Sequence, residues 1–174
     1  MVVGQKFSRG LAVAALATAV MLGASAARAG AWIAAAKDGC QVWDPNPQLD
    51  ETVIWSGTCA NGHAEGPGTV TWIKGKAAIE TDEGEWRAGR QAGKGTQTWP
   101  TGRYDGELAN GEPNGRGVLT LQKLRYEGEF RDGKPNGIGS LMAGSESVQG
   151  VWKDGCLQGG RRKASIGVPL SACR

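Results

Sequence analysis

The chain has 174 residues, with 20 Lys and Arg against 17 Asp and Glu, and 29 of its residues are Gly. Residues 1–29 hold three of the basic residues and none of the acidic ones, so the remainder carries no net formal charge. This balance argues against nucleic-acid binding, which needs an excess of Lys and Arg on one surface. The length predicts one small domain, and the glycine content indicates either disorder or a repeat that requires glycine.

Residues 1–29 are predicted to be a secretory signal peptide. Basic residues precede an apolar run over residues 11–22, and small residues then lead to the cleavage motif Ala27-Arg28-Ala29. The alternative is an uncleaved anchor, but the run is shorter than the roughly 20 residues that a membrane-spanning helix needs. We therefore expect a mature chain that begins near Gly30, has no transmembrane span after cleavage, and is periplasmic or secreted.

The four cysteines all lie in the predicted mature chain, in a compartment that permits disulfides. Three pairings are open, and local loop closure favours Cys40 with Cys59 and Cys156 with Cys173. A four-cysteine metal site is disfavoured because the CxxC-like spacing of such sites is absent. No cofactor or metal is expected.

The middle of the chain repeats with a period near 22 residues. The segment that begins at Tyr104 aligns without a gap with the one that begins at Tyr126. The second segment reads aromatic-x-Gly-x-aromatic followed by Gly and Gly-x-Gly, and the first has Leu108 at the second aromatic position. Further copies begin at residues 55, 82 and 148, although the second lacks its first aromatic residue and the fifth lacks its last glycine.

This pattern resembles the MORN (membrane occupation and recognition nexus) repeat over roughly residues 53–160, in a type exported by bacteria. MORN proteins are associated with protein interaction, self-assembly and proposed phospholipid contact, so the resemblance implies partners of these kinds.

The residues also predict the architecture directly. In Tyr126-Glu127-Gly128-Glu129-Phe130 the aromatic and acidic residues alternate, as in a strand with one buried face. Asp132-Gly133 and Pro135-Asn136-Gly137 predict a hairpin loop of several residues, with a second arm from Gly137 to Met142. Stacked copies give an all-β fold: an elongated antiparallel hairpin meander of about five repeats, in a single twisted sheet with disulfide-tied ends. Residues 30–52 are expected to form an N-terminal cap and residues 161–174 a basic C-terminal tail or cap.

Catalytic motifs are sparse. The single histidine, His63, has no activated Ser or Cys near it in sequence, and there is no Gly-x-Ser-x-Gly motif. Pairs of carboxylates such as Glu127 and Glu129 could in principle perform acid–base chemistry, but the repeat itself generates them as a solvated face. The sequence therefore predicts a protein that is not an enzyme.

The predicted function is a binding or scaffolding module of the cell envelope that uses an elongated β surface. Its partner is expected to be a protein or a second copy of the chain. The alternative is binding to phospholipid at a membrane surface or to a glycan. The candidate binding residues are aromatic and basic: Trp86, Trp99, Tyr104, Tyr126, Phe130, Trp152, Arg161, Arg162 and Lys163.

Overall fold

The computed structural model describes residues 2–3, 30–160 and 162–173, and apart from one 3-10 turn their regular secondary structure is all β-strand. The predicted signal peptide lies outside the described residues except for Val2 and Val3. The elements are β1 (Val2–Val3), β2 (Ala31–Ala34), β3 (Gln41–Asp44), β4 (Glu51–Trp55), β5 (Thr58–Ala60), β6 (His63–Lys74), β7 (Ala77–Arg87), β8 (Arg90–Trp99), β9 (Gly102–Ala109), β10 (Glu112–Leu121), β11 (Leu124–Arg131), β12 (Lys134–Ala143), β13 (Glu146–Lys153), β14 (Cys156–Leu157), β15 (Ser165–Ile166) and a 3-10 turn η1 (Leu170–Ala172).

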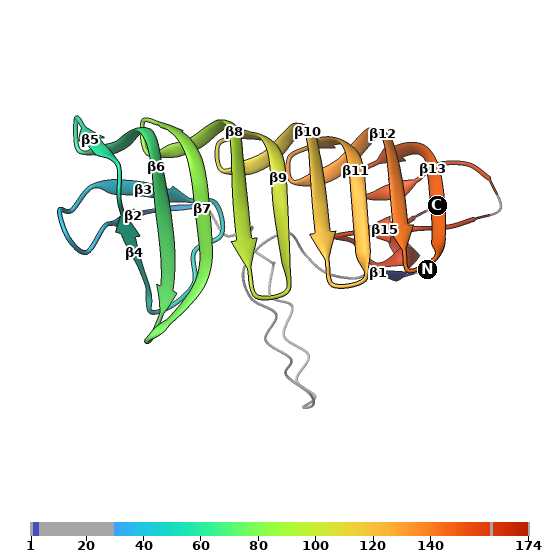
Figure 1. Cartoon of the computed structure of the whole chain (residues 1–174), viewed down its shortest axis with the longest axis horizontal. Helices are drawn as coiled ribbons and strands as arrows, with labels where there is room; N and C mark the ends of the chain where they lie inside the picture. The colour runs from blue at the N-terminus through green and yellow to red at the C-terminus, as the bar shows by residue number, and fades with distance from the viewer. Residues whose placement is uncertain (1, 4–29, 161, 174) are drawn as a thin grey trace, which may run out of the picture.

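All the strands of the described residues belong to one sheet of 15 strands. From β6 to β13 each strand pairs antiparallel with the next one in the chain, which gives an elongated meander (Figure 1). The predicted all-β meander is thus confirmed. At the two ends the sheet also contains parallel pairs, β3 with β6 and β1 with β15, because the terminal segments fold back along the array.

The hairpins close with two-residue turns at regular spacing. Along one edge of the meander the turns are Asn61-Gly62, Ala88-Gly89, Asn110-Gly111, Asp132-Gly133 and Asp154-Gly155, and both residues of each turn have positive φ. Positive φ at both central positions is the signature of a type I′ turn, which Asn-Gly and Asp-Gly favour because they tolerate that conformation. The predicted loop of several residues is therefore wrong.

Pro135-Asn136-Gly137 lies inside β12 rather than in a loop. The pairing of β11 with β12 runs from Phe130 opposite Pro135 to Gly128 opposite Gly139, so β12 accommodates two extra residues in a bulge. The second arm begins at Lys134, three residues before the predicted start. A bulge uses the same residue types as a turn, since both need backbone conformations outside the regular strand.

A row of glycines crosses the sheet at the middle of the strands. Each member pairs with the next across the neighbouring strand: Gly68, Gly84, Gly95, Gly106, Gly117, Gly128, Gly139 and Gly150. A side chain at Gly139 would overlap the Tyr126 ring, and one at Gly117 would overlap Tyr104. Gly117 and Gly139, like Gly68 beneath Trp55, are thus needed because an aromatic ring lies directly on their backbone.

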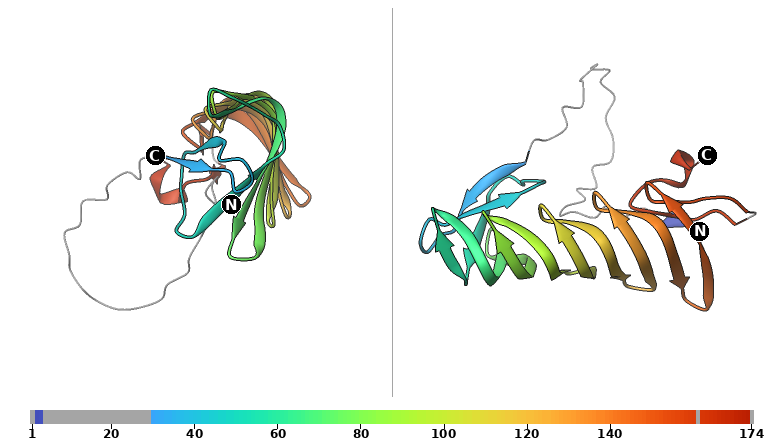
Figure 2. Two further views of the ribbon diagram at one scale, coloured as in Figure 1. Left: turned by 90° about the vertical axis from the view of Figure 1, so that its left-hand side faces the viewer. Right: turned by 90° about the horizontal axis from the view of Figure 1, so that it is seen from above.

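The sheet is curved, and its N-terminal hairpin β2–β3 and its C-terminal segment lie on the concave side (Figure 2). We call the concave side the inner face and the opposite side the outer face. The buried hydrophobic side chains lie on the inner face and form two clusters. The N-terminal cluster is Ala35, Cys40, Val42, Val53, Trp55, Ala64, Val70, Trp72 and Trp86, and the C-terminal cluster is Tyr104, Leu108, Leu119, Leu121, Leu124, Tyr126, Phe130, Leu141, Trp152, Ala164 and Ile166.

Two disulfides tie the ends of the array, as local loop closure predicts. Cys40 bonds Cys59, with their Cα atoms 5.9 Å apart, and Cys156 bonds Cys173, with their Cα atoms 5.5 Å apart. Disulfides persist in oxidising environments, so the two bridges indicate an extracytoplasmic protein. No helix formed by the described residues is long and apolar enough to cross a membrane.

Candidate functional site

The aromatic side chains that the sequence offered as a binding surface lie on the inner face. Trp99 is partly buried and packs against the C-terminal cluster. The other five are at most 3 % exposed: Trp86, Tyr104, Tyr126, Phe130 and Trp152. A partner needs exposed rings, so the structure gives these five a packing role in place of the predicted surface.

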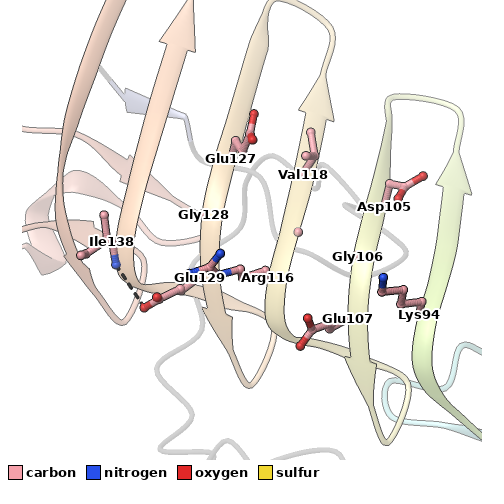
Figure 3. A pocket seen from close by; sticks show the side chains of 11 residues that line it. Lys94, Asp105, Gly106, Glu107, Arg116, Val118, Glu127, Gly128, Glu129 and Ile138 are labelled. Atoms are coloured by element: carbon pink, nitrogen blue, oxygen red, sulfur yellow. Dashed lines mark hydrogen bonds between the residues drawn. The ribbon is translucent and has the colours of Figure 1, made fainter.

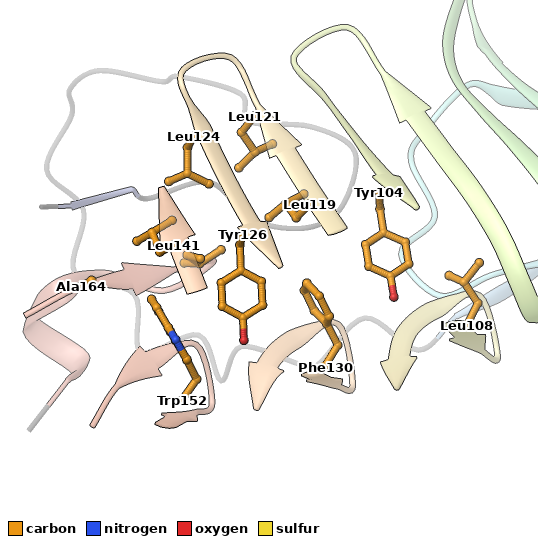
Figure 4. Packing of buried hydrophobic residues seen from close by; sticks show 11 residues of the cluster. Tyr104, Leu108, Leu119, Leu121, Leu124, Tyr126, Phe130, Leu141, Trp152 and Ala164 are labelled. Atoms are coloured by element: carbon orange, nitrogen blue, oxygen red, sulfur yellow. The ribbon is translucent and has the colours of Figure 1, made fainter. Parts of the chain in front are cut away.

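The rings of the C-terminal cluster pack edge to face (Figure 4). The Tyr126 ring centroid lies 5.1 Å from that of Phe130 and 5.1 Å from that of Trp152, and Phe130 also contacts Tyr104 at 5.1 Å. The Tyr104 hydroxyl donates to the Glu107 carbonyl at 2.8 Å. Burial raises the pKa of both tyrosines well above its usual value, and nearby carboxylates raise it further.

The predicted basic cluster is only partly described. Arg161 lies outside the described residues, while Arg162 and Lys163 are exposed. Arg162 Nη1 donates to the Ser147 carbonyl at 3.0 Å, which ties the C-terminal segment to β13. Arg162 therefore has a structural contact in addition to its charge.

The histidine considered for catalysis lies directly after the Asn61-Gly62 turn, at the start of β6. His63 Nδ1 lies 2.9 Å from the Asn61 carbonyl, and its ring packs edge-on against Trp32 with centroids 4.8 Å apart. The search of the described residues for groups of at least three His, Cys, Asp or Glu that could hold a metal ion found none.

The outer face carries a cross-strand row of alternating charge. Lys94 on β8 lies opposite Glu107 on β9, and Arg116 on β10 lies opposite Glu129 on β11. Side chains directly opposite on one face of a sheet interact, and opposite charges stabilise the pair by less than about 1 kcal/mol. The row therefore contributes a patterned polar surface more than it contributes stability.

A shallow groove of about 610 Å³ follows this row from β8 to β12 (Figure 3). Beside the row, Arg103 pairs with Asp105 at 3.1 Å and Arg125 pairs with Glu127 at 2.7 Å, so these charges neutralise each other within a strand. The groove floor contains the backbone of three members of the glycine row, Gly106, Gly117 and Gly128.

The groove ends at an apolar patch on β12 and β13. Ile138, Met142 and Val151 are 62 %, 48 % and 55 % exposed, and Ile138 lies directly opposite Val151. We call these three residues the outer apolar patch. The Ile138 amide also donates to Glu129 Oε2 at 3.2 Å, so the patch and the charged row are joined (Figure 3).

The outer apolar patch departs from the repeat at each of its positions. One period earlier, Ile138 corresponds to Arg116, Met142 to Thr120 and Val151 to Glu129. The patch thus replaces polar residues at three positions, although its side chains remain exposed. The sequence reasoning did not identify these residues, because it searched the aromatic positions that define the repeat. A comparison of the variable positions between copies would have found them.

The geometry defines the class of the protein: a disulfide-tied array of stacked β-hairpins with a buried aromatic face and a polar outer face. The family model for the MORN repeat matches residues 83–102, 104–123 and 126–143, so this chain is a MORN-repeat protein. The copies that begin at residues 55 and 148 keep the same type I′ turn and a glycine of the cross-strand row. MORN repeats are generally binding and scaffolding modules rather than catalytic ones. A search of curated proteins found no match to the chain.

Proposed function

We propose that this protein is a non-catalytic binding module of the cell envelope, periplasmic or secreted, that docks a protein partner on its outer face. The partner places apolar side chains on the outer apolar patch and polar side chains along the groove. The observation that supports this proposal is the change from polar to apolar residues at Ile138, Met142 and Val151 without any gain in burial. Exposed apolar side chains that are grouped and rimmed by charge are typical of interaction surfaces.

The test is site-specific photocrosslinking of the full chain in its own cells. A photoreactive side chain at Val151 should crosslink one protein reproducibly, whereas the same side chain at Thr120, an outer-face position in an earlier copy, should not. Crosslinked dimers of the chain would identify a second copy as the partner instead. Fractionation of the same cells measures whether the protein is periplasmic or secreted.

A double variant that restores the polar residues of the preceding copy tests the outer apolar patch directly. Ile138→Arg with Val151→Glu installs the pair that Arg116 and Glu129 form one period earlier, so the array should tolerate it. The partner crosslink, detected from Ser147 on the same outer face, should then be lost while thermal stability is retained. Capture of the same partner at wild-type yield by a folded double variant would refute the proposed surface.

A further inference from the structure

A second group of side chains, partly or fully exposed, lies at the N-terminal end of the array, away from the outer apolar patch. Trp32 on β2 and Trp43 on β3 are cross-strand neighbours whose ring centroids are 5.1 Å apart. Trp32 is 43 % exposed, which makes it the most exposed tryptophan of the described residues. The guanidinium carbon of Arg90 lies 4.0 Å from the Trp43 centroid and 5.2 Å from the Trp32 centroid.

The group is held rigidly. The Gln41 and Trp43 amides of β3 donate to the Gly62 and Gly89 carbonyls, each at 2.8 Å, and the Cys40–Cys59 disulfide closes the same segment. The Trp32 ring lies against the turn at Gly89, where a Cβ atom would be 2.6 Å from the ring. The site is therefore formed before any ligand arrives, which lowers the entropic cost of binding.

Arg90 is not required by the repeat. Its position is occupied by Glu112, Lys134 and Cys156 in the later copies. Within the described residues its guanidinium carbon lies over the two indoles, and its side chain makes no hydrogen bond or ion pair. An arginine held against aromatic rings still presents its N–H groups in a planar fork that matches a carboxylate.

The neighbouring groups favour a sugar ring. The exposed indole of Trp32 offers a flat apolar surface beside the Arg90 fork, and the C–H face of a pyranose can stack on such a surface. Because a carbonyl can only accept, the contact of His63 Nδ1 with the Asn61 carbonyl requires Nδ1 to donate. In the neutral ring this leaves Nε2 as an acceptor for a hydroxyl group. The geometry points to a binding site for an acidic sugar, with the ring on Trp32, the carboxylate on Arg90 and a hydroxyl on His63.

The test is an NMR titration of the full chain that follows the indole N–H of Trp32, assigned with Trp32→Phe. Sodium glucuronate should shift this signal saturably, whereas glucose should bind at least about tenfold more weakly because it lacks the carboxylate. Acetate and inorganic phosphate should also bind more weakly, since neither stacks on an indole. Equal affinity for glucose, or for acetate or phosphate, would overturn the acidic-sugar assignment. Tighter binding of a peptide carboxylate such as acetyl-Gly-Phe would do the same.

Arg90→Lys is the decisive variant, because it keeps the charge and removes the planar fork. We expect it to weaken glucuronate binding about tenfold while the melting temperature stays near that of the wild type. Arg131→Lys, an exposed position at the end of β11 outside the groove, is the matched control and should bind as the wild type does. An Arg90→Lys protein that binds glucuronate normally would show that the fork is not used.

Discussion

The two halves of the inner face differ in how they fill the space above the glycine row. In the C-terminal half Tyr126 lies on Gly139, and in the N-terminal half Trp55 lies on Gly68 in the same way. Between them, at the second copy, the first aromatic position is held by Asp82, which is 2 % exposed. The missing aromatic residue thus divides one continuous aromatic stack into two clusters.

Polar side chains lie between the two clusters, and we call this region the polar division. Trp72 Nε1 donates to Asp82 Oδ2 at 2.6 Å, and Gln97 Nε2 donates to Gln91 Oε1 at 3.2 Å. Gln91 also covers Gly95, where a Cβ atom would lie 2.7 Å from the Gln91 amide nitrogen. Buried polar groups are tolerated when they are hydrogen-bonded. The comparison teaches that the turns and glycines set the backbone of the repeat. The buried side chains that cover the glycines can be either aromatic or polar.

Removal of a ring from one cluster should have the largest effect. Tyr126→Ala deletes a fully buried ring that contacts Phe130 and Trp152, and we expect a loss of about 3–5 kcal/mol in the free energy of unfolding. Urea unfolding measures the loss. Hydrogen exchange should show faster exchange in β10–β13 and retained protection in β4–β6, because repeat arrays couple mainly between neighbours.

Trp55→Ala is the reciprocal control and should reverse that exchange pattern. Uniform loss of protection along the whole array in both variants would show that the polar division does not separate the clusters energetically. A loss below about 1 kcal/mol for Tyr126→Ala would contradict the burial of the ring itself.

Alkaline pH should act on only one of the clusters, because both tyrosines of the chain belong to the C-terminal one. Burial raises the pKa of Tyr104 and Tyr126 above 10.0, whereas in the unfolded chain they ionise near that value. The stability that they contribute is therefore complete below pH 10 and is lost as pH rises above it, since the unfolded state then releases its protons first.

Urea unfolding at increasing pH measures this loss, and the absorbance of tyrosinate reports the ionisation directly. The double variant Tyr104→Phe/Tyr126→Phe is the control, because it keeps the rings and removes the titrating groups. The control should lose less stability above pH 10 than the wild type. An equal decline in both proteins would assign the alkaline effect to other groups.

The glycine row allows a finer comparison within the C-terminal half. Gly139→Ala places a methyl group against the Tyr126 ring and should cost about 1–3 kcal/mol, as overpacking of a core does. Gly150→Ala is the matched variant, because the nearest atom to its Cβ is the flexible Leu157 Cδ1 at 2.8 Å. Thermal unfolding should therefore rank Gly150→Ala close to the wild type and Gly139→Ala well below it. The reverse order would mean that the ring does not rest on Gly139.

Much of the fold could be predicted because it depends on local and periodic signals. The period of 22 fixed the order of the hairpins, and short loops favoured the two disulfides. The bulge at Pro135-Asn136-Gly137 could not be told from a loop, because both use the same residues and differ only in cross-strand register. The five buried rings were offered as a surface because a single sheet has a thin core. The glycine row instead lets the Tyr104 and Tyr126 rings lie against the backbone, and Phe130 packs edge to face with both of them.

The outer apolar patch and the Trp32–Arg90 group could not be predicted from the sequence, for two different reasons. Ile138 and Val151 are 13 residues apart in the sequence and become neighbours only through the register of β12 and β13. Trp32 and Arg90 come from separate elements, and their contact depends on the return of β3 along the turns of the array. Neither arrangement follows from the period of the repeat.

The smallest difference between the halves lies in their turns. Ala88 has a φ of 46° and Asn110 has a φ of 54° at the same position of successive type I′ turns, and both side chains are exposed. Alanine pays a steric cost in this left-handed region that asparagine largely avoids. Ala88→Asn should therefore stabilise the protein by about 1 kcal/mol, and Asn110→Ala should destabilise it by a similar amount.

The two substitutions are reciprocal, so each serves as the control for the other in one series of thermal and urea unfolding measurements. The double variant Ala88→Asn/Asn110→Ala should return close to the wild-type stability, because turns in separate hairpins contribute nearly additively. The turn glycines are hydrogen-bonded to the preceding copy, Gly89 N to the Ala64 carbonyl and Gly111 N to the Gln91 carbonyl, each at 2.9 Å. A double variant that departs from additivity by more than about 0.5 kcal/mol would mean that this ladder transmits strain from one turn to the next, across the polar division that separates the two clusters.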